Sequence, residues 1–240
     1  MLNIKNLSKT YKGGKKAVSN LTLDIEAGDI YGFIGHNGAG KTTTIKCAVG
    51  ILDFDEGEIR IDGHSIQEEP ILCKSLTAYI PDNPDLYEHL TGIQYLNFIA
   101  DIFGISQDDR TDRIQKYAKV FEITSALGDP ISSYSHGMKQ KLAVIAALAH
   151  HPKLLVLDEP FVGLDPQAAF TLKEIMRELC REGSAIFFST HVLDVAEKLC
   201  NKIAIIKNGS LVTSGKTEEL THGQSLESVF LEVVAHVEAD

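Results

Sequence analysis

Apolar and polar residues follow two different patterns along the chain. In the first pattern they alternate, which is typical of strands that bury one face of an antiparallel sheet, at residues 2–11, 17–25 and 57–62. In the second pattern the apolar run is almost continuous, which is typical of parallel strands buried on both faces, at residues 30–34, 154–157, 185–188 and 203–206. The chain is therefore predicted to be an α/β protein that combines a parallel sheet with an antiparallel β subdomain.

Helical spacing dominates the middle of the chain. Between about residues 85 and 151, apolar side chains recur at intervals of three and four, which predicts a helical subdomain inserted into the α/β core. Within it, residues 138–150 predict a helix, and Ser135 is a suitable N-cap. Residues 226–234 predict a final amphipathic helix.

Composition places the chain among globular proteins. With 240 residues, 44% of them hydrophobic and 23% charged, it is long enough for one large core and too short for two domains of ordinary size. No run approaches the ~18 apolar residues of a membrane span, and no signal peptide is evident, so we expect a cytoplasmic protein. A formal net charge of −10 argues against a general nucleic-acid binder. The four cysteines lack zinc-ligand spacing and are expected to be reduced packing residues.

Candidate chemistry begins directly after the apolar run 30–34. Residues 35–43 read Gly-His-Asn-Gly-Ala-Gly-Lys-Thr-Thr, the pattern of a phosphate-binding loop between a strand and a helix. Its three glycines allow positive-φ turns that direct backbone N–H groups at an anion, and the dipole of the following helix adds to the attraction. The alternative is a glycine-rich turn that precedes Lys-Thr by chance, and the flanking strand and helix argue against it. The chain is therefore predicted to bind a nucleoside triphosphate in a P-loop NTPase core.

The side chains of this loop have separate expected roles. Lys41 would lie on the β- and γ-phosphates, Thr42 would offer its hydroxyl to the accompanying Mg²⁺, and Thr43 would donate to an α- or β-phosphate oxygen. The loop residues expected to bind the nucleotide are Gly35, His36, Asn37, Gly38, Ala39, Gly40, Lys41, Thr42 and Thr43.

Two adjacent carboxylates follow the apolar run 154–157. They are Asp158 and Glu159, and Pro160 then ends the strand. In a phosphate-loop fold the first carboxylate can hold Mg²⁺, and the second can polarise the water that attacks the γ-phosphate. A pair of exposed loop acids is the alternative, but the independent presence of a phosphate loop favours a catalytic role.

Further short motifs complete an ordered series. In chain order they are Tyr11, residues 79–83 (Tyr-Ile-Pro-Asp-Asn), residues 134–138 (Tyr-Ser-His-Gly-Met), residues 163–165 (Gly-Leu-Asp) and His191. Together with the phosphate loop and the paired carboxylates, these motifs resemble, in order and register, those of the ATP-binding subunit of an ABC transporter. The resemblance covers about residues 1–220. It implies a nucleotide-binding domain over residues 1–225 and a short C-terminal helix or tail over residues 226–240.

The resemblance implies a head-to-tail dimer with each ATP held between two subunits. Tyr11 would stack on adenine, with Val18 on its flank. Ser135 and the backbone N–H groups of Gly137 and Met138, in the signature motif, would bind the γ-phosphate of the ATP on the partner. If these roles are absent, Tyr11 is a surface aromatic of the sheet and Ser135 is only a helix cap.

The same resemblance implies that hydrolysis depends on a few side chains. Glu159 would orient or activate water, Lys41 would bind the phosphates, and His191 would contact the γ-phosphate. Asp165 would carry information across the dimer interface. The structural alternatives are that His191 is simply a residue at a helix start, and that Asp165 is the N-cap of a helix with Pro166 in its first position.

Two motifs depart from the common family pattern. Asp82 stands where the Q-loop usually has Gln; a carboxylate can serve Mg²⁺, directly or through water, but when ionised it cannot donate to the attacking water. The signature reads Tyr-Ser-His-Gly-Met at residues 134–138 in place of Leu-Ser-Gly-Gly-Gln. Both departures resemble the branch of exporters that serve antibiotics, peptides and drugs.

The expected protein is thus an ATPase on the cytoplasmic face of the cell membrane. Its partners would be a second nucleotide-binding subunit, identical or homologous, and an integral membrane permease whose cytoplasmic helix docks beside the helical segment and Asp82. A soluble ABC ATPase that acts on the ribosome or DNA is the alternative, but such proteins usually fuse two cassettes or contain a long coiled coil. The presence of Lys41, Asp158, Glu159 and His191 disfavours a regulatory module without turnover.

Overall fold

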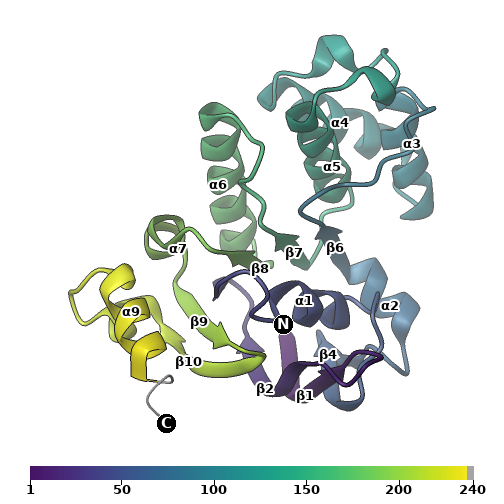
Figure 1. Ribbon diagram of the computed structural model, residues 1–240. Helices are drawn as coiled ribbons and strands as arrows, with labels where there is room; N and C mark the ends of the chain where they lie inside the picture. The colour runs from purple at the N-terminus through teal and green to yellow at the C-terminus, as the bar shows by residue number, and fades with distance from the viewer. Residues whose placement is uncertain (237–240) are drawn as a thin grey trace.

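Two β-sheets form the frame of the computed structural model, which describes residues 1–236 (Figure 1). The larger sheet has the strand order β10-β9-β3-β8-β7-β6. Its strands are β3 (Ile30–Ile34), β6 (Thr77–Ile80), β7 (Leu154–Asp158), β8 (Ala185–Thr190), β9 (Lys202–Lys207) and β10 (Ser210–Lys216). Neighbouring strands pair in parallel except β9 and β10, which form an antiparallel hairpin at one edge.

The smaller sheet is antiparallel and has the strand order β2-β1-β4-β5. Its strands are β1 (Leu2–Thr10), β2 (Lys16–Ile25), β4 (Glu56–Ile61) and β5 (His64–Ser65). Along β1 and β2 buried positions are interleaved with exposed ones, because one face of the sheet packs on the core and the other meets solvent.

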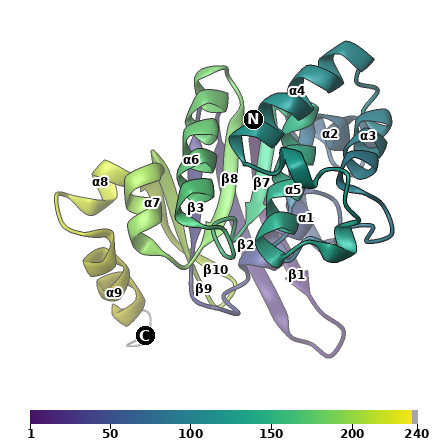
Figure 2. The same cartoon turned by 90° about the horizontal axis from the view of Figure 1, so that it is seen from above.

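Nine α-helices surround the two sheets within residues 1–236 (Figures 1 and 2). They are α1 (Lys41–Ala48), α2 (Pro70–Leu76), α3 (Gly92–Ile102), α4 (Gln107–Val120), α5 (His136–Ala149), α6 (Pro166–Arg181), α7 (Leu193–Leu199), α8 (Thr217–Thr221) and α9 (Leu226–His236). Two 3₁₀ turns, Thr124–Ala126 and Ile131–Ser133, lie between α4 and α5. In Figure 2, helices α3, α4 and α5 lie on one side of the sheets, whereas α8 and α9 lie on the other.

Alternating side chains of β8 divide the interior into two apolar clusters. Phe187 belongs to the cluster that the antiparallel sheet and α1 form, and its ring centroid lies 5.5 Å from that of Phe33. Phe188 points to the opposite face, toward a cluster that includes residues of α5, α6 and α7, and its centroid lies 5.9 Å from that of Phe161. The parallel sheet is therefore buried on both faces, as its continuous apolar strands predict.

The α/β class and the two kinds of sheet are confirmed. The seven predicted strands are found, and their ends differ from the predicted ones by no more than two residues. The predicted helix over 138–150 is α5, which begins at His136 because Ser135 caps it. The predicted terminal helix is α9, and the last four residues of the expected tail, 237–240, lie outside the described residues. All four cysteines are free and buried, as predicted.

Several elements were not predicted. Strand β6 has only four residues, and β10 is an edge strand whose exposed polar residues weaken the apolar signal. Helices α2 and α8 have seven and five residues, too few to show a helical period. The helical segment also begins later than expected, since α3 starts at Gly92, where Thr91 and Gln94 form a capping box.

His150 joins the ends of α3 and α5. Its ring stacks on Phe103 with centroids 3.8 Å apart, and both ring nitrogens are buried without a hydrogen-bond partner. Burial lowers the pKa of His150 from 6.5 to about 4. His150 is therefore neutral in the folded chain at pH 7, and its protonation opposes folding.

Acid should destabilise the chain partly through His150. Because its pKa is lower in the folded state than in the unfolded state, its contribution to stability is complete above pH 6.5 and is lost as the pH falls toward 4. We expect the wild type to lose up to about 3 kcal/mol more unfolding free energy between pH 7 and pH 4 than His150→Phe, which keeps the stack and cannot ionise. Urea unfolding over this pH range measures the difference. Parallel curves for the two proteins would contradict it.

Candidate functional site

The loop between β3 and α1 has the conformation of an anion-binding turn. Gly38 and Gly40 have φ values of 82° and 110°, in the left-handed region that glycine tolerates. Gly35 does not have a positive φ, which corrects the sequence-based expectation. It is needed for space instead, because a Cβ at this position would lie 2.6 Å from the carbonyl oxygen of Ile206 in β9.

The turn between β9 and β10 supports this loop from the side. The N–H of Gly209 donates to the carbonyl of Ala39 at 2.8 Å, and the N–H of Ser19 donates to the carbonyl of Gly209 at 2.8 Å. A Cβ on Gly40 would lie 2.5 Å from the carbonyl oxygen of Ala17. The loop is thus fixed between strand β2 and a hairpin more than 160 residues later in the chain.

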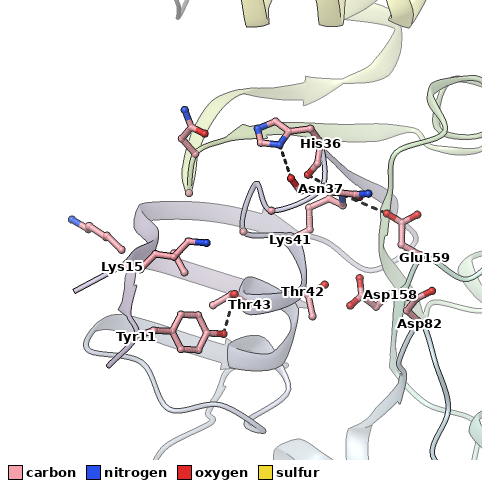
Figure 3. Close-up of a pocket in the computed structure, with 16 residues that line it drawn as sticks. Tyr11, Lys15, His36, Asn37, Lys41, Thr42, Thr43, Asp82, Asp158 and Glu159 are labelled. Carbon is pink, nitrogen blue, oxygen red and sulfur yellow. Dashed lines mark hydrogen bonds and ion pairs between the residues drawn. The ribbon is translucent and has the colours of Figure 1, made fainter. Parts of the chain in front are cut away.

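Lys41 crosses the loop and is almost completely buried (Figure 3). Its Nζ donates to the carbonyls of Gly35 at 2.7 Å and His36 at 3.3 Å. The same Nζ lies 3.4 Å from Oε1 of Glu159, which is close enough for charge attraction. A positive charge is therefore held at the point where the loop can receive an anion.

Asp158 and Glu159 are fixed by a serine of the neighbouring strand. Ser189 Oγ donates to Oδ1 of Asp158 at 2.5 Å and accepts from the N–H of Glu159 at 3.0 Å. The parallel register of β7 and β8 places Asp158 beside Ser189. Sequence reasoning missed Ser189, because only the pairing of two strands that lie 30 residues apart brings it to the site.

Glu159 lies between two basic side chains. It has a left-handed backbone with a φ of 49°, and its Oε2 lies 3.0 Å from Nδ1 of His191. Its Oε1 is buried and makes no hydrogen bond, although it faces Lys41. Lys41, Glu159 and His191 thus form a connected row of side chains at the carboxyl ends of β3, β7 and β8, which is where open α/β sheets bind their ligands.

A cavity of about 410 Å³ opens beside these residues (Figure 3). It is lined by Tyr11, Lys15, Lys16, Ala17, His36, Asn37, Gly38, Gly40, Lys41, Thr42, Thr43, Asp82, Asp158, Glu159, Asn208 and Gly209. Seven of the nine predicted residues of the phosphate loop therefore meet the paired carboxylates and Tyr11 at one place, while Gly35 and Ala39 do not line the cavity. Lys15, Lys16, Asn208 and Gly209 were not predicted to lie here, since turn residues without a motif give no signal in the sequence.

Tyr11 stands at one end of the cavity and Asp82 at the other. The Tyr11 hydroxyl and Thr43 Oγ1 are hydrogen bonded at 3.2 Å, so the aromatic ring is tied to the phosphate loop. Val18, which was expected beside the base, is completely buried in the core and does not line the cavity; its neighbour Ala17 does. Successive side chains of β2 point to opposite faces of the sheet, and Val18 points to the inner face, so it does not reach the cavity.

Oxygen atoms of three side chains face the same end of the cavity. Thr42, Asp158 and Asp82 lie near one another in Figure 3 and come from α1, β7 and the segment after β6. A hydroxyl and two carboxylates are oxygen donors of the kind that Mg²⁺ prefers. Among residues 1–236, no group of three or more His, Cys, Asp or Glu side chains is arranged to hold a metal alone, so a metal here would also need oxygens from its ligand.

The signature residues do not line this cavity. Ser135 caps α5, and its Oγ accepts from the N–H of Met138 at 3.3 Å, as predicted for an N-cap. Ser135 is exposed, and Gly137 and Met138 are partly exposed. The predicted site residues of one chain therefore occupy two separate surfaces.

Asp165 is the N-cap of α6, as the structural alternative in the sequence analysis predicted. Its Oδ1 accepts from the N–H of Ala168 at 2.8 Å and caps α6, which begins at Pro166. Its Oδ2 lies 2.7 Å from Nζ of Lys141. Lys141 and the helix N–H groups lower the pKa of Asp165, so the carboxylate stays ionised at neutral pH.

Comparison with known proteins agrees with this geometry. A protein-family model described as ABC transporter matches residues 18–162. The chain belongs to the ABC transporter family. It is accordingly an ATP-binding ATPase.

The relatives of this ABC protein cover most of its length. The ABC-type transporter ATP-binding protein EcsA of Bacillus subtilis (strain 168) is 36% identical over 92% of this chain and 89% of its own. The linearmycin resistance ATP-binding protein LnrL of the same strain is 32% identical over 92% of this chain and 70% of its own. A solved structure of an ATP-binding subunit of an ABC transporter superposes with a TM-score of 0.93, at 33% identity over 98% of this chain and 99% of that one.

A more distant solved structure shares the ABC fold. It is the dimeric, ADP- and Pi-bound, post-hydrolysis form of the ATP-binding cassette MJ0796, at a TM-score of 0.82 and 23% identity over 90% of this chain and 99% of that one. No helix within residues 1–236 is both long and apolar enough to cross a membrane.

Removal of the Ser189 hydroxyl tests how the two carboxylates are held. Ser189→Ala leaves Oδ1 of Asp158 and the N–H of Glu159 without their partner in a buried position, which we expect to cost about 1–3 kcal/mol of unfolding free energy. ATP turnover should fall about tenfold because both carboxylates lose their orientation. Steady-state ATPase assays and urea unfolding measure the two effects. Ser75→Ala, on the exposed side of α2, serves as the matched control, and equal results for both variants would contradict this role of Ser189.

Proposed function

We propose that this chain hydrolyses MgATP as one half of a head-to-tail pair and thereby powers a separate membrane permease. The observation that carries the proposal is the separation of the two surfaces. Lys41, Glu159 and His191 converge beside the phosphate loop, whereas Ser135 at the start of α5 lies outside that cavity. A second subunit that brings its signature to the cavity would complete the site.

The residues around the cavity divide the chemistry among them. Lys41 and the N–H groups of the loop bind the phosphates, and Thr43 can donate to one of them. Thr42 and Asp158 would hold Mg²⁺, with Asp82 facing the same point. When bound, the ion neutralises charge on the phosphate oxygens. Tyr11 stacks on the base, and its bond to Thr43 keeps the ring in place.

Glu159 acts as the base that orients the attacking water. Its carboxylate lies 3.4 Å from Nζ of Lys41 and 3.0 Å from Nδ1 of His191. The γ-phosphate carries negative charge to Lys41 and therefore displaces Glu159 from it. The released carboxylate is then free to accept a hydrogen bond from water, and His191 is free to donate to the γ-phosphate.

The face that would meet the second subunit contains exposed apolar side chains. Val162, Phe170 and Val192 are 43%, 59% and 42% exposed and lie in the segments that follow Glu159 and His191. Ser135, Gly137 and Met138 would bind the γ-phosphate across the interface by charge-assisted hydrogen bonds. The partner is a second copy of this chain or a homologue.

A second cavity, of about 280 Å³, would receive the permease. It lies between α3, α5 and the segment after β6, and its walls are largely apolar, with Pro84, Leu86, Tyr95, Ile99, Phe103, Ala143, Ala146, Ala147 and His150 among them. Tyr87 is half exposed and packs edge-on against both Tyr95 and Phe98. An amphipathic cytoplasmic helix fits a groove of this kind. Such docking would hold the chain at the cytoplasmic face of the membrane.

The direction of transport is proposed from two observations. The signature Tyr-Ser-His-Gly-Met and Asp82 in the Q-loop resemble the motifs of the antibiotic, peptide and drug exporters. The similarity to a linearmycin resistance protein supports the same branch. We therefore favour export of a peptide, antibiotic or drug-like molecule, chosen by the permease.

Glu159→Gln tests the catalytic assignment. The amide keeps the size of the side chain but cannot act as a base, so ATP turnover should fall at least ~100-fold while ATP still binds. The ATP-bound dimer should then accumulate, which size-exclusion chromatography with light scattering detects. Glu174→Gln, on the exposed face of α6, is the matched control. Turnover near that of the wild type would remove Glu159 from this role.

Purification from gently solubilised membranes tests the permease partner. We expect the tagged chain to retain a polytopic membrane protein at comparable abundance, identified by mass spectrometry. Replacement of Tyr87 and Phe98 by Ala should remove that protein and leave ATP binding unchanged, because both rings are partly exposed and lie beside the second cavity. Ile71→Ala, at an 85% exposed site on α2, should have no effect. Recovery of ribosomal, DNA-bound or only soluble partners would contradict the transporter assignment.

A further inference from the structure

The first turn of α5 contacts the loop that follows Glu159. A Cβ on Gly137 would lie 2.9 Å from the carbonyl oxygen of Gly163, so these backbones are in close contact. Five residues after His136, Lys141 forms its ion pair with Asp165 at 2.7 Å. The loop 160–165 therefore contacts the signature helix at two points, through the close approach of Gly137 and Gly163 and through the ion pair of Lys141 and Asp165.

The imidazole of His136 occupies the space above Gly163. A Cβ on Gly163 would lie 2.7 Å from Nε2 of His136 and still nearer to Cδ2, which is too close for either atom. The Cγ atom of the same ring would be 3.8 Å away, so only the outer edge of the ring would clash. Gly163 also has a φ of 82°, which favours glycine. The side chain at 136 and the missing side chain at 163 are thus complementary in shape.

We propose that His136 is a positioning residue that links the signature helix to Glu159 of the same chain. The inference rests on the proposed head-to-tail pair, in which the signature binds the partner's ATP. When that ATP draws the start of α5 toward it, the His136 ring pushes on Gly163 and Lys141 pulls on Asp165. The loop 160–165 moves with them, and Glu159 lies at its beginning.

The route differs from direct contact across the interface. His136 acts within one chain. It links the signature, which binds the ATP held by the partner, to Glu159, which acts on the ATP held by the same chain as His136. Binding of ATP at one site is thereby coupled to the orientation of the carboxylate at the other. Such a coupling appears as cooperative dependence of turnover on ATP concentration.

The test is a double-variant cycle at positions 136 and 163. Gly163→Ala forces the new methyl group against the ring, and we expect kcat to fall about tenfold. His136→Ala removes Cδ2 and Nε2, so the double variant should regain turnover to within about threefold of His136→Ala alone. His136→Ala should also lower the Hill coefficient for ATP toward one, while the equilibrium affinity for N-methylanthraniloyl-ATP stays that of the wild type.

Gly63→Ala is the matched control for backbone strain. Gly63 has a φ of 86°, close to that of Gly163, but a Cβ there would meet nothing within 4 Å. The turnover and Hill coefficient of Gly63→Ala should equal those of the wild type. Any loss in Gly163→Ala is then due to the clash with His136 and not to the positive φ.

Four results would overturn the inference. A double variant as slow as Gly163→Ala would show that the ring is not what the methyl group meets. A Hill coefficient unchanged in His136→Ala would show that the ring carries no coupling, and a lost nucleotide affinity would make His136 a ligand rather than a positioning residue. A wild type that hydrolyses ATP without cooperativity or dimer formation would overturn the head-to-tail pair as well, so the two failures are distinguishable.

Discussion

The buried charge of Lys41 determines the arrangement of the nucleotide site. A buried ammonium group is costly unless it is paired, and here two loop carbonyls and Glu159 surround it. These groups can only reach it because the phosphate loop, β7 and β8 end at one edge of the parallel sheet. The same carboxylate contacts His191, so in the proposed mechanism phosphate binding and release of the base would be one exchange of charge partners.

Local signals in the sequence were sufficient for the main motifs. Continuous apolar runs identified β3, β7, β8 and β9, and the capping preference of Ser135 fixed the start of α5. What the sequence could not show was pairing between distant segments. The role of Ser189 depends on the register of two strands, and Val18 was misplaced because the choice between it and Ala17 depends on the inward or outward phase of β2. Gly35 was correctly expected in the loop but for the wrong reason, since only the packed structure shows how near β9 lies.

The helical segment serves as the connection between the nucleotide site and its surroundings. Helix α5 begins with the signature, contacts the loop after Glu159 through His136 and Lys141, and ends at the stack of His150 on Phe103. One helix thus has the signature residues at one end and the apolar cavity beside the other. A partner bound at that cavity and an ATP bound at the signature would both act on the same body, which is a direct mechanical reason for transport and hydrolysis to depend on each other.

The hydrogen bond between Gly209 and Ala39 sets a lower limit on the functional unit. The segment that the family model matches, residues 18–162, contains the phosphate loop and both acidic residues. It lacks Tyr11, the serine and histidine at the end of β8, and the hairpin turn that closes the phosphate loop from the side. A gene fragment limited to that segment would keep every residue of the best-known motif and lose the scaffold that gives it shape. The phosphate-loop motif is a short stretch of sequence, but residues from Tyr11 to Gly209 are needed to form the binding site.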